Sequence, residues 1–321
     1  MSITTRNCEK LFWGCIYINK KIPKIAEECL YRWGKEDDNT KNLSNKIDKF
    51  ISQLGDDQKN GEILLTLLKK YNYYSRQKVE EILKSFYDEI KKLELPKSRT
   101  IYSRIEDNSK INSSNNLLEE FKIINDISNN YSHDISKIDL DKFEEIDYII
   151  FIDDIIGTGD TVKNFIRSNK EKFKRVKSRI FCIECMEKAK NKIERYLEEE
   201  EIECIIMPYN LSPKAFKDNN DFENAMEARR SLYNFEKILA NGDNRFILGY
   251  KESEALVSFY RNTPNNTISS YWNPYNGWKP LFQRNLDKPD FMNDRIHKKK
   301  SSKFNIPYNL EKKLKKKKGE S

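Results

Sequence analysis

The sequence lacks any apolar run of the ~18–20 residues that a membrane-spanning helix needs. Its one N-terminal apolar stretch, Leu11 to Ile18, follows Arg6 and Lys10. This stretch is short and ends in Asn19-Lys20-Lys21, without the small residues of a signal-peptide cleavage site. We therefore predict no membrane association, no secretion and a cytoplasmic location.

Histidine and glycine are scarce as well, with two and ten residues among 321. The pair Cys182 and Cys185 has CxxC spacing, but a zinc site would need a second pair or nearby histidines, and only His133 and His297 exist. Since both cysteines lie in the apolar run 180–186, we interpret them as buried thiols of a strand. Six cysteines without a tight framework are typical of a reducing compartment.

The positive charge of the chain is confined to one end. The net charge is +8, and residues Arg295 to Ser321 contain eleven Lys/Arg against two Glu, so the other 294 residues sum to about −1. We expect this tail to be disordered. It could bind nucleic acid without sequence preference, or serve only solubility. The remainder is rich in aromatic residues, which make up 12% of the chain and indicate a folded protein.

The first 95 residues have the periodicity of helices. Apolar residues recur at helical spacing between Ile47 and Leu54, between Ile63 and Tyr71, and between Val79 and Ile90. A short turn over 72–75 would separate the last two helices, and Ser75 would cap the third. A helical bundle is favoured over a DNA-binding helix-turn-helix, because the last helix carries as many acids as bases.

After Pro96 the pattern changes to alternating strands and helices. The runs 99–103, 146–152, 178–186 and 202–207 indicate strands, and 146–152 is nearly continuously apolar, as in a strand buried on both faces. Helical segments separate them, so we predict an α/β fold with a parallel sheet and helices on both faces. The predicted domains are a helical domain over 1–95, the α/β domain over 96–285 and the tail over 286–321. A late polar and aromatic segment, 262–282, would cover a ligand-binding site or pack over the edge of the sheet.

One segment combines the features of a phosphate-binding site. The apolar strand leads to Asp153 and Asp154, and a loop with two Gly and two Thr then leads to a helix near Thr161. Glycines allow close backbone approach to an anion, and a helix N-terminus favours a phosphate. Neighbouring carboxylates bind sugar hydroxyls or Mg²⁺. Neither GxxxxGK[ST] nor GxGxxG is present, so a P-loop NTPase and a dinucleotide fold are excluded. An acidic turn without a ligand is the remaining alternative.

Residues 149–161 resemble the PRPP-binding loop of type I phosphoribosyltransferases at every fixed position: four apolar residues, two acids, two apolar residues, one variable residue, Thr-Gly, one variable residue and Thr. The resemblance implies that Asp153 and Asp154 hold the ribose hydroxyls and Mg²⁺, directly or through water. It also implies a loop that cradles the 5′-phosphate of PRPP or of another ribose 5-phosphate compound. That loop comprises Ile155, Ile156, Gly157, Thr158, Gly159, Asp160 and Thr161.

At two positions this sequence differs from many type I phosphoribosyltransferases. Members acting on 6-oxopurines carry Asp where this chain has Gly157, and many members have Gly where it has Asp160. A carboxylate beside a phosphate is unfavourable unless it points away. The family also needs an earlier loop for pyrophosphate, and the candidate lies between Ser103 and Ser114. It offers Arg104, Lys110, Ser113 and Ser114, although a solvated loop is an equal alternative.

The layout over residues 45–284 is also similar to phosphoribosyltransferase-like proteins of bacterial anti-phage conflict systems, some of them encoded beside reverse transcriptases (retron-type). The resemblance includes Ser113-Ser114 with Leu117-Leu118, and the late 262–267 segment followed by Trp and Pro-Leu-Phe. It implies a defence effector with partner proteins. We therefore predict Mg²⁺-dependent phosphoribosyl transfer or related nucleotide metabolism. The rival predictions are a PRPP or nucleotide sensor without turnover and a nucleic-acid adaptor acting through the tail.

Overall fold

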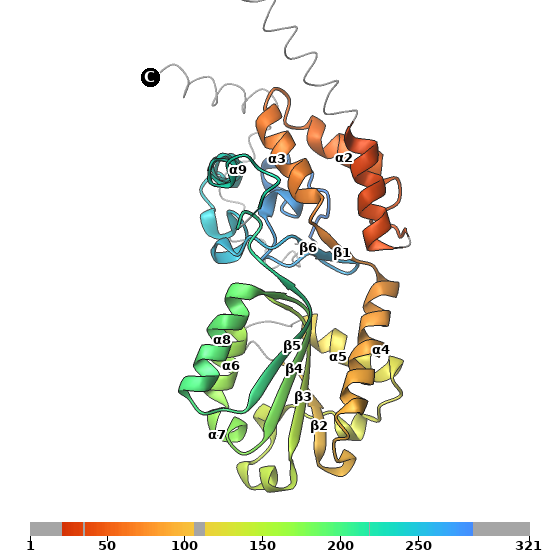
Figure 1. Ribbon diagram of the computed structural model, residues 1–321, viewed down its shortest axis with the longest axis vertical. Coiled ribbons are helices and arrows are strands. Elements are labelled where there is room, and N and C mark those ends of the chain that lie inside the picture. The colour runs from red at the N-terminus through yellow and green to blue at the C-terminus, as the bar shows by residue number, and fades with distance from the viewer. Residues whose placement is uncertain (1–20, 35, 106–112, 218, 285–321) are drawn as a thin grey trace, which may run out of the picture. The chain divides into compact units, whose positions relative to one another are not determined.

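The computed structural model describes residues 21–34, 36–105, 113–217 and 219–284 (Figure 1). The chain divides into two compact units. One is continuous and comprises residues 76–214, and the other combines residues 1–75 with 215–321. The helix after residue 75 groups with the sheet, so the first division falls before the predicted boundary at residue 95, and residues 215–284 group with the N-terminal helices instead of with the predicted α/β domain over 96–285. The predicted tail over 286–321 lies outside the described residues.

The unit of residues 76–214 contains a four-stranded parallel sheet whose strand order follows the chain. Residues 149–152 are fully buried, which fits a strand covered on both faces. The α/β fold with a parallel sheet is therefore confirmed. The strands are β2 (Thr100–Ser103), β3 (Tyr148–Ile156), β4 (Lys177–Met186) and β5 (Cys204–Ser212).

Helices cover both faces of this sheet. Phe151 on β3 packs against Phe165 and Phe173, whereas Phe181 on β4 packs against Phe86. Because Phe151 pairs with Ile180, Phe151 and Phe181 point to opposite faces. The helices are α4 (Arg76–Lys92), α5 (Ser113–Ile124), α6 (Asp160–Ser168), α7 (Lys170–Phe173) and α8 (Glu187–Glu199), with 3₁₀ turns at Lys97–Arg99, Asn129–Tyr131, Ile135–Lys137 and Leu140–Glu145.

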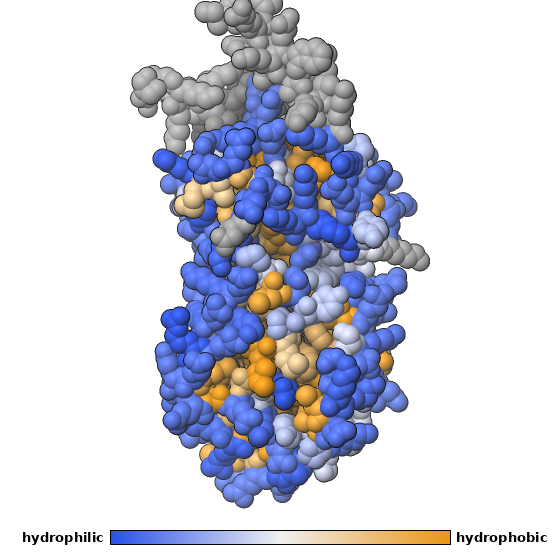
Figure 2. Space-filling view, viewed as in Figure 1, coloured by the Kyte–Doolittle hydropathy of each residue, from blue (hydrophilic) through white to orange (hydrophobic). Residues whose placement is uncertain are grey.

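The edge strand β5 leaves part of one face open. Ile205, Tyr209 and Leu211 alternate along it and are each 44–46% exposed. Figure 2 shows apolar surface in this unit, among predominantly hydrophilic side chains. The sheet is thus less completely covered at β5 than at β3.

The other unit is built on helices and one short pair of strands. The predicted turn over 72–75 is wrong, because Asn72–Tyr74 forms β1 and pairs in parallel with β6 (Val257–Phe259). Its partner lies about 185 residues away, which local periodicity does not reveal. The helices are residues 21–33, α2 (Leu43–Ser52), α3 (Gln58–Leu68) and α9 (Ala225–Ala240), with 3₁₀ turns at Asn244–Phe246, Tyr250–Glu252, Ser269–Tyr271 and Tyr275–Gly277.

The late aromatic segment packs into the core of this second unit. Trp272, Trp278 and Phe282 are all buried. The Trp278 indole N–H donates to the carbonyl of Ser270, and the Tyr271 hydroxyl donates to that of Leu64. The segment therefore joins α3 to the end of the described chain as part of a hydrophobic core.

Candidate functional site

The two acidic residues lie within β3 rather than after it. The sequence suggests a strand that ends near Ile152, but the pairing with β4 continues to Ile156, which pairs with Cys185. Ile155 and Ile156 therefore belong to the strand and not to the loop. Side chains alternate along a strand, but the Asp154 carboxyl group lies near enough to that of Asp153 to interact with it, so the two form one acidic pair.

The environments of the two carboxylates nevertheless differ. Asp153 is 9% exposed, whereas Asp154 is half-buried. The amide of Asp154 donates to Asp153 Oδ1 at 2.9 Å, and the amide of Ile155 donates to Asp154 Oδ1 at 2.8 Å. Burial, and secondarily the charge of Asp154, raises the pKa of Asp153 well above its ordinary value. The pair is a place where a cation would stabilise both ionised carboxylates.

A sharp turn joins β3 to α6. Gly159 is the N-cap of α6 with φ +76° and ψ −2°, a left-handed conformation that favours glycine. A Cβ atom there would lie 3.1 Å from the Ala189 carbonyl oxygen and 3.2 Å from Ile193 Cγ1 of α8. Only glycine lets the turn approach α8 this closely, so α6 begins at a fixed position beside the end of β3.

The first turn of α6 carries the residues predicted to hold a phosphate. Thr161 is exposed, and Gly157 and Thr158 are half-buried. The N-terminal amides of a helix have no acceptors within the helix, so this turn can donate to an anion. The structure thus brings Gly157 to Thr161 together as one short turn and helix start.

Asp160 lies in that turn, and both oxygens of its carboxylate interact with neighbouring side chains. Its Oδ2 accepts a hydrogen bond from the Thr158 hydroxyl at 3.1 Å, and its Oδ1 forms a hydrogen-bonded ion pair with Lys192 of α8. The Asp160 amide in turn donates to Thr158 Oγ1 at 3.4 Å. The sequence does not single out Lys192, because only the packing of α8 against the turn places it there.

The site lies where the chain changes direction across the sheet. Tyr102 of β2 pairs with Ile150 of β3 and also forms an isolated parallel bridge to Ser132. Ser132 and β3 are therefore both neighbours of β2. The chain runs from β2 to Ser132 on one side of this strand and then returns to β3 on its other side. In open α/β sheets, ligands bind at the carboxyl ends of strands at such a switch point. Arg104 follows β2, so it lies at the same edge as Asp153.

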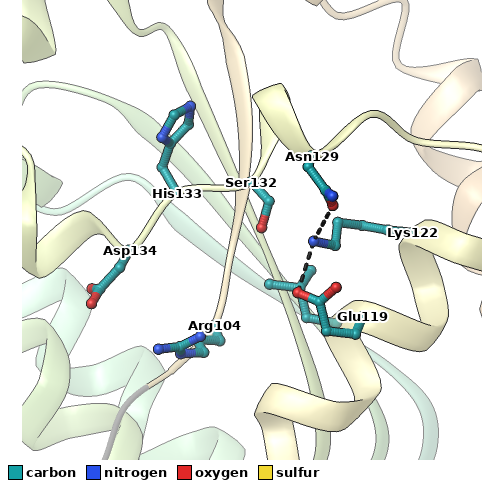
Figure 3. A pocket seen from close by; sticks show the side chains of 8 residues that line it. Arg104, Glu119, Lys122, Asn129, Ser132, His133 and Asp134 are labelled. Atoms are coloured by element: carbon teal, nitrogen blue, oxygen red, sulfur yellow. Dashed lines mark hydrogen bonds and ion pairs between the residues drawn. The ribbon is translucent and has the colours of Figure 1, made fainter.

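A pocket of about 290 Å³ opens beside the end of β2 (Figure 3). The predicted pyrophosphate loop contributes Arg104 to it. Lys110 lies outside the described residues, and Ser113 and Ser114 are described only as the first backbone positions of α5. The pocket is lined by Arg104, Leu118, Glu119, Lys122, Asn129, Ser132, His133 and Asp134.

Lys122 is the most buried charged group of this pocket, with its side chain 5% exposed. Its ammonium donates to Asn129 Oδ1 at 2.9 Å and pairs with Glu119 at 2.7 Å, as the dashed lines in Figure 3 show. Lys122 is not among the residues predicted from the sequence. Its position four residues after Leu118, on the apolar side of a helix, is the available signal.

A second polar cluster that sequence reasoning misses lies at the ends of β4 and β5. Glu184 is 1% exposed and accepts hydrogen bonds from Asn210 Nδ2 at 3.0 Å and from the Ser212 hydroxyl. It pairs in register with Ile155, so it shares the sheet face of Asp153. Polar side chains at the carboxyl edge therefore extend from the buried Asp153 and Glu184 to the partly buried residues of β5.

The interpretation of Cys182 and Cys185 as buried thiols agrees with the structure. Both are fully buried and reduced, and burial raises the pKa of Cys182 well above its ordinary value. Within the described part of the chain, no three His, Cys, Asp or Glu side chains form a metal-binding group. Among the same residues, no helix has the length and apolar character to cross a membrane.

Comparison with known proteins gives one family. No curated protein matches the sequence. The model of the PRTase-CE family matches residues 47–284, which is about three quarters of the chain and includes β1 to β6 together with the turn after β3. Because the match covers well over half of the sequence, this chain belongs to PRTase-CE, a phosphoribosyltransferase-like family.

Proposed function

We propose that the protein binds PRPP with Mg²⁺ at the carboxyl edge of its sheet and transfers the phosphoribosyl group to an acceptor. One observation carries the proposal. Two adjacent carboxylates in β3, a glycine turn and the start of α6 occupy one short stretch, Asp153 to Thr161, at the switch point of an α/β sheet. The family match includes this stretch.

The carboxylates fit a hard divalent cation. Mg²⁺ prefers oxygen ligands and binds proteins through one or two carboxylates together with substrate oxygens and water. Asp153 and Asp154 offer such oxygens, and the raised pKa of Asp153 reflects the burial and repulsion that a cation would relieve. When bound, Mg²⁺ would neutralise the charge of the pyrophosphate and the carboxylates. The same two side chains would accept hydrogen bonds from the ribose hydroxyls.

The turn after β3 would bind the 5′-phosphate. The first amides of α6 and the hydroxyls of Thr158 and Thr161 are donors suited to a dianion. Gly159 holds these donors close to the end of β3. The turn would fix the ribose so that its C1 faces the pyrophosphate side, and positioning would supply much of the rate.

The pyrophosphate group would lie toward the end of β2. Arg104 is the described cation at that strand end, and the resemblance adds Lys110, Ser113 and Ser114 of the same loop. Bond cleavage at C1 would leave charge on the departing pyrophosphate, which these donors and Mg²⁺ would stabilise. Phosphoribosyltransferases that act on 6-oxopurines carry an Asp at the position of Gly157. A 6-oxopurine acceptor would therefore find no carboxylate at this position of the present chain.

The proposal is tested by ligand-induced stabilisation. A ligand at 100 times its Kd stabilises the folded state by about 2.7 kcal/mol, so Mg²⁺·PRPP at millimolar concentration should raise the melting temperature of the full-length protein. The double variant Asp153→Asn, Asp154→Asn should fold and show no rise. A matched control is Glu198→Gln, Glu199→Gln, which removes two adjacent exposed charges at the end of α8 and should respond like the wild type. Absence of a shift in the folded wild type would refute PRPP binding.

A sensor that binds PRPP without turnover is the second candidate, and Gly157 favours it because no acid is available there to contact a purine acceptor. Release of pyrophosphate from PRPP, measured with purified protein and candidate acceptors, separates the two functions. A role in anti-phage defence, as the resemblance implies, is a further proposal. It predicts that phages form fewer plaques on cells expressing this protein with its defence partners than on cells expressing the Asp153→Asn, Asp154→Asn variant in the same way.

A further inference from the structure

The hydroxyl of Thr158 donates its hydrogen bond to a neighbouring side chain of the turn. A threonine hydroxyl has one proton to donate. In this structure that proton points to Asp160 Oδ2, at an oxygen–oxygen distance of 3.1 Å. A phosphate bound in the turn would require the same proton. The carboxylate of Asp160 therefore accepts the proton that a bound phosphate oxygen would accept.

The second oxygen of the same carboxylate is held by Lys192, which reaches the turn from α8. This reach follows from the packing of the helix. Gly159 lies against Ala189 and Ile193, and Lys192 precedes Ile193 by one residue. Figure 1 shows α6 and α8 on the same side of the sheet. Lys192 is thus placed by the backbone contact that makes Gly159 necessary.

We propose that Asp160 is an internal competitor for the phosphate of the substrate, and that Lys192 sets the strength of this competition. The inference rests on the proposed function, because it concerns the same turn. Asp160 accepts the hydrogen bond that Thr158 donates, and Lys192 neutralises Asp160. A phosphate monoester displaces the carboxylate from Thr158 and stays close to the cation of Lys192. The pair makes the turn selective for a dianionic phosphate over weaker anions.

The opposite effects of the two side chains define the test. A carboxylate a few ångströms from a dianion is repelled by it, and the interaction is larger near a protein surface than in bulk water. Asp160→Asn removes the charge, and Asp160→Ala also releases the Thr158 hydroxyl. We expect both variants to bind ribose 5-phosphate roughly tenfold more tightly than the wild type, a change of about 1.4 kcal/mol.

Lys192→Met should act in the other direction. It leaves Asp160 without its cation, so ribose 5-phosphate should bind roughly tenfold more weakly. In the Asp160→Ala background the same change should have a clearly smaller effect, because part of the role of Lys192 is to neutralise Asp160. The matched control is Lys190→Met, since Lys190 pairs with Glu194 within α8 rather than with the turn.

The measurement is isothermal titration of the full-length protein with ribose 5-phosphate and, separately, with ribose. Tighter binding of the phosphorylated sugar alone by both Asp160 variants supports the inference. If the wild type binds ribose 5-phosphate and neither Asp160 variant binds it more tightly, the inference is overturned while the proposed function stands. If neither the folded wild type nor the folded variants bind it, the proposed function fails and the inference fails with it.

Discussion

Replacing Gly159 by alanine should separate the α6 turn from α8. The Ala side chain would have to adopt φ +76°, and the left-handed region costs an L-residue about 1–2 kcal/mol. Its Cβ would also lie 3.1 Å from the carbonyl oxygen of Ala189 and 3.2 Å from Ile193 Cγ1. Optimal separations between carbon atoms are about 3.5–4.0 Å, so α8 must shift, and such overpacking typically costs about 1–3 kcal/mol. The expected loss of stability is about 2–5 kcal/mol.

The chain offers a matched control for the backbone part of this effect. Gly55 has φ +55°, and a Cβ there would meet no atom within 4 Å. Gly55→Ala should therefore cost only about 1–2 kcal/mol. The difference between the two variants reports the contact with α8.

Hydrogen exchange followed by mass spectrometry suits this comparison, because it resolves local opening in a chain with two compact units. Gly159→Ala should accelerate exchange in the peptides of α6 and α8, whereas Gly55→Ala should leave them unchanged. The reasoning would be refuted if α6 and α8 kept their wild-type exchange rates in Gly159→Ala.

Three further changes test other parts of the structure. The pKa of Asp153 is raised by burial, so the contribution of this carboxyl group to stability is full below about pH 4 and is lost as the pH rises through the folded-state pKa. Asp153→Asn should therefore stabilise the metal-free protein more at pH 7.5 than at pH 4.5 in urea titrations. An equal difference at both pH values would contradict this. Arg229→Met should destabilise the unit containing α9 by about 3 kcal/mol, because Glu254 is 2% exposed and pairs with Arg229 at 2.8 Å; thermal melting measures the loss, and an unchanged midpoint would speak against it. Lys122→Met should cost about 1–2 kcal/mol, because the ammonium of this buried side chain donates to Asn129, and a urea midpoint equal to that of the wild type would disprove that role.

The sheet can be predicted from the sequence because its signals are local. The continuous apolar run of β3 identifies a buried strand, and the acids and glycines that follow it predict the place of the site. The residues Gly157 to Thr161 form the turn after β3 and the start of α6, and their role in phosphate binding stays a prediction. The pattern places the end of the strand too early, since apolar patterning is interrupted at Asp153 while hydrogen bonding to β4 continues to Ile156.

The contacts that modify the site are not predictable in the same way. Lys192 and Lys122 are ordinary lysines in helical patterns, and their roles depend on which residue of another element lies opposite. The sequence marks Asp160 as an unfavourable charge beside a phosphate, but its partner on α8 is about thirty residues later in the chain. The pairing of β1 with β6 spans an even longer separation, so residues 72–75 have the local pattern of a turn.

That long separation bears on how the polypeptide folds during synthesis. The sheet unit is continuous, so residues 76–214 have all emerged from the ribosome before β6 is made. The other unit cannot complete its core until residues 257–282 have been synthesised. Before then β1 has no β6 to pair with, and the carbonyl of Leu64 lacks the hydrogen bond from the Tyr271 hydroxyl. Closing a loop over an already compact insert loses less chain entropy than closing it over an unfolded one. Chains truncated at residue 220 and released from the ribosome should therefore protect the sheet from proteolysis while residues 21–75 remain cleavable.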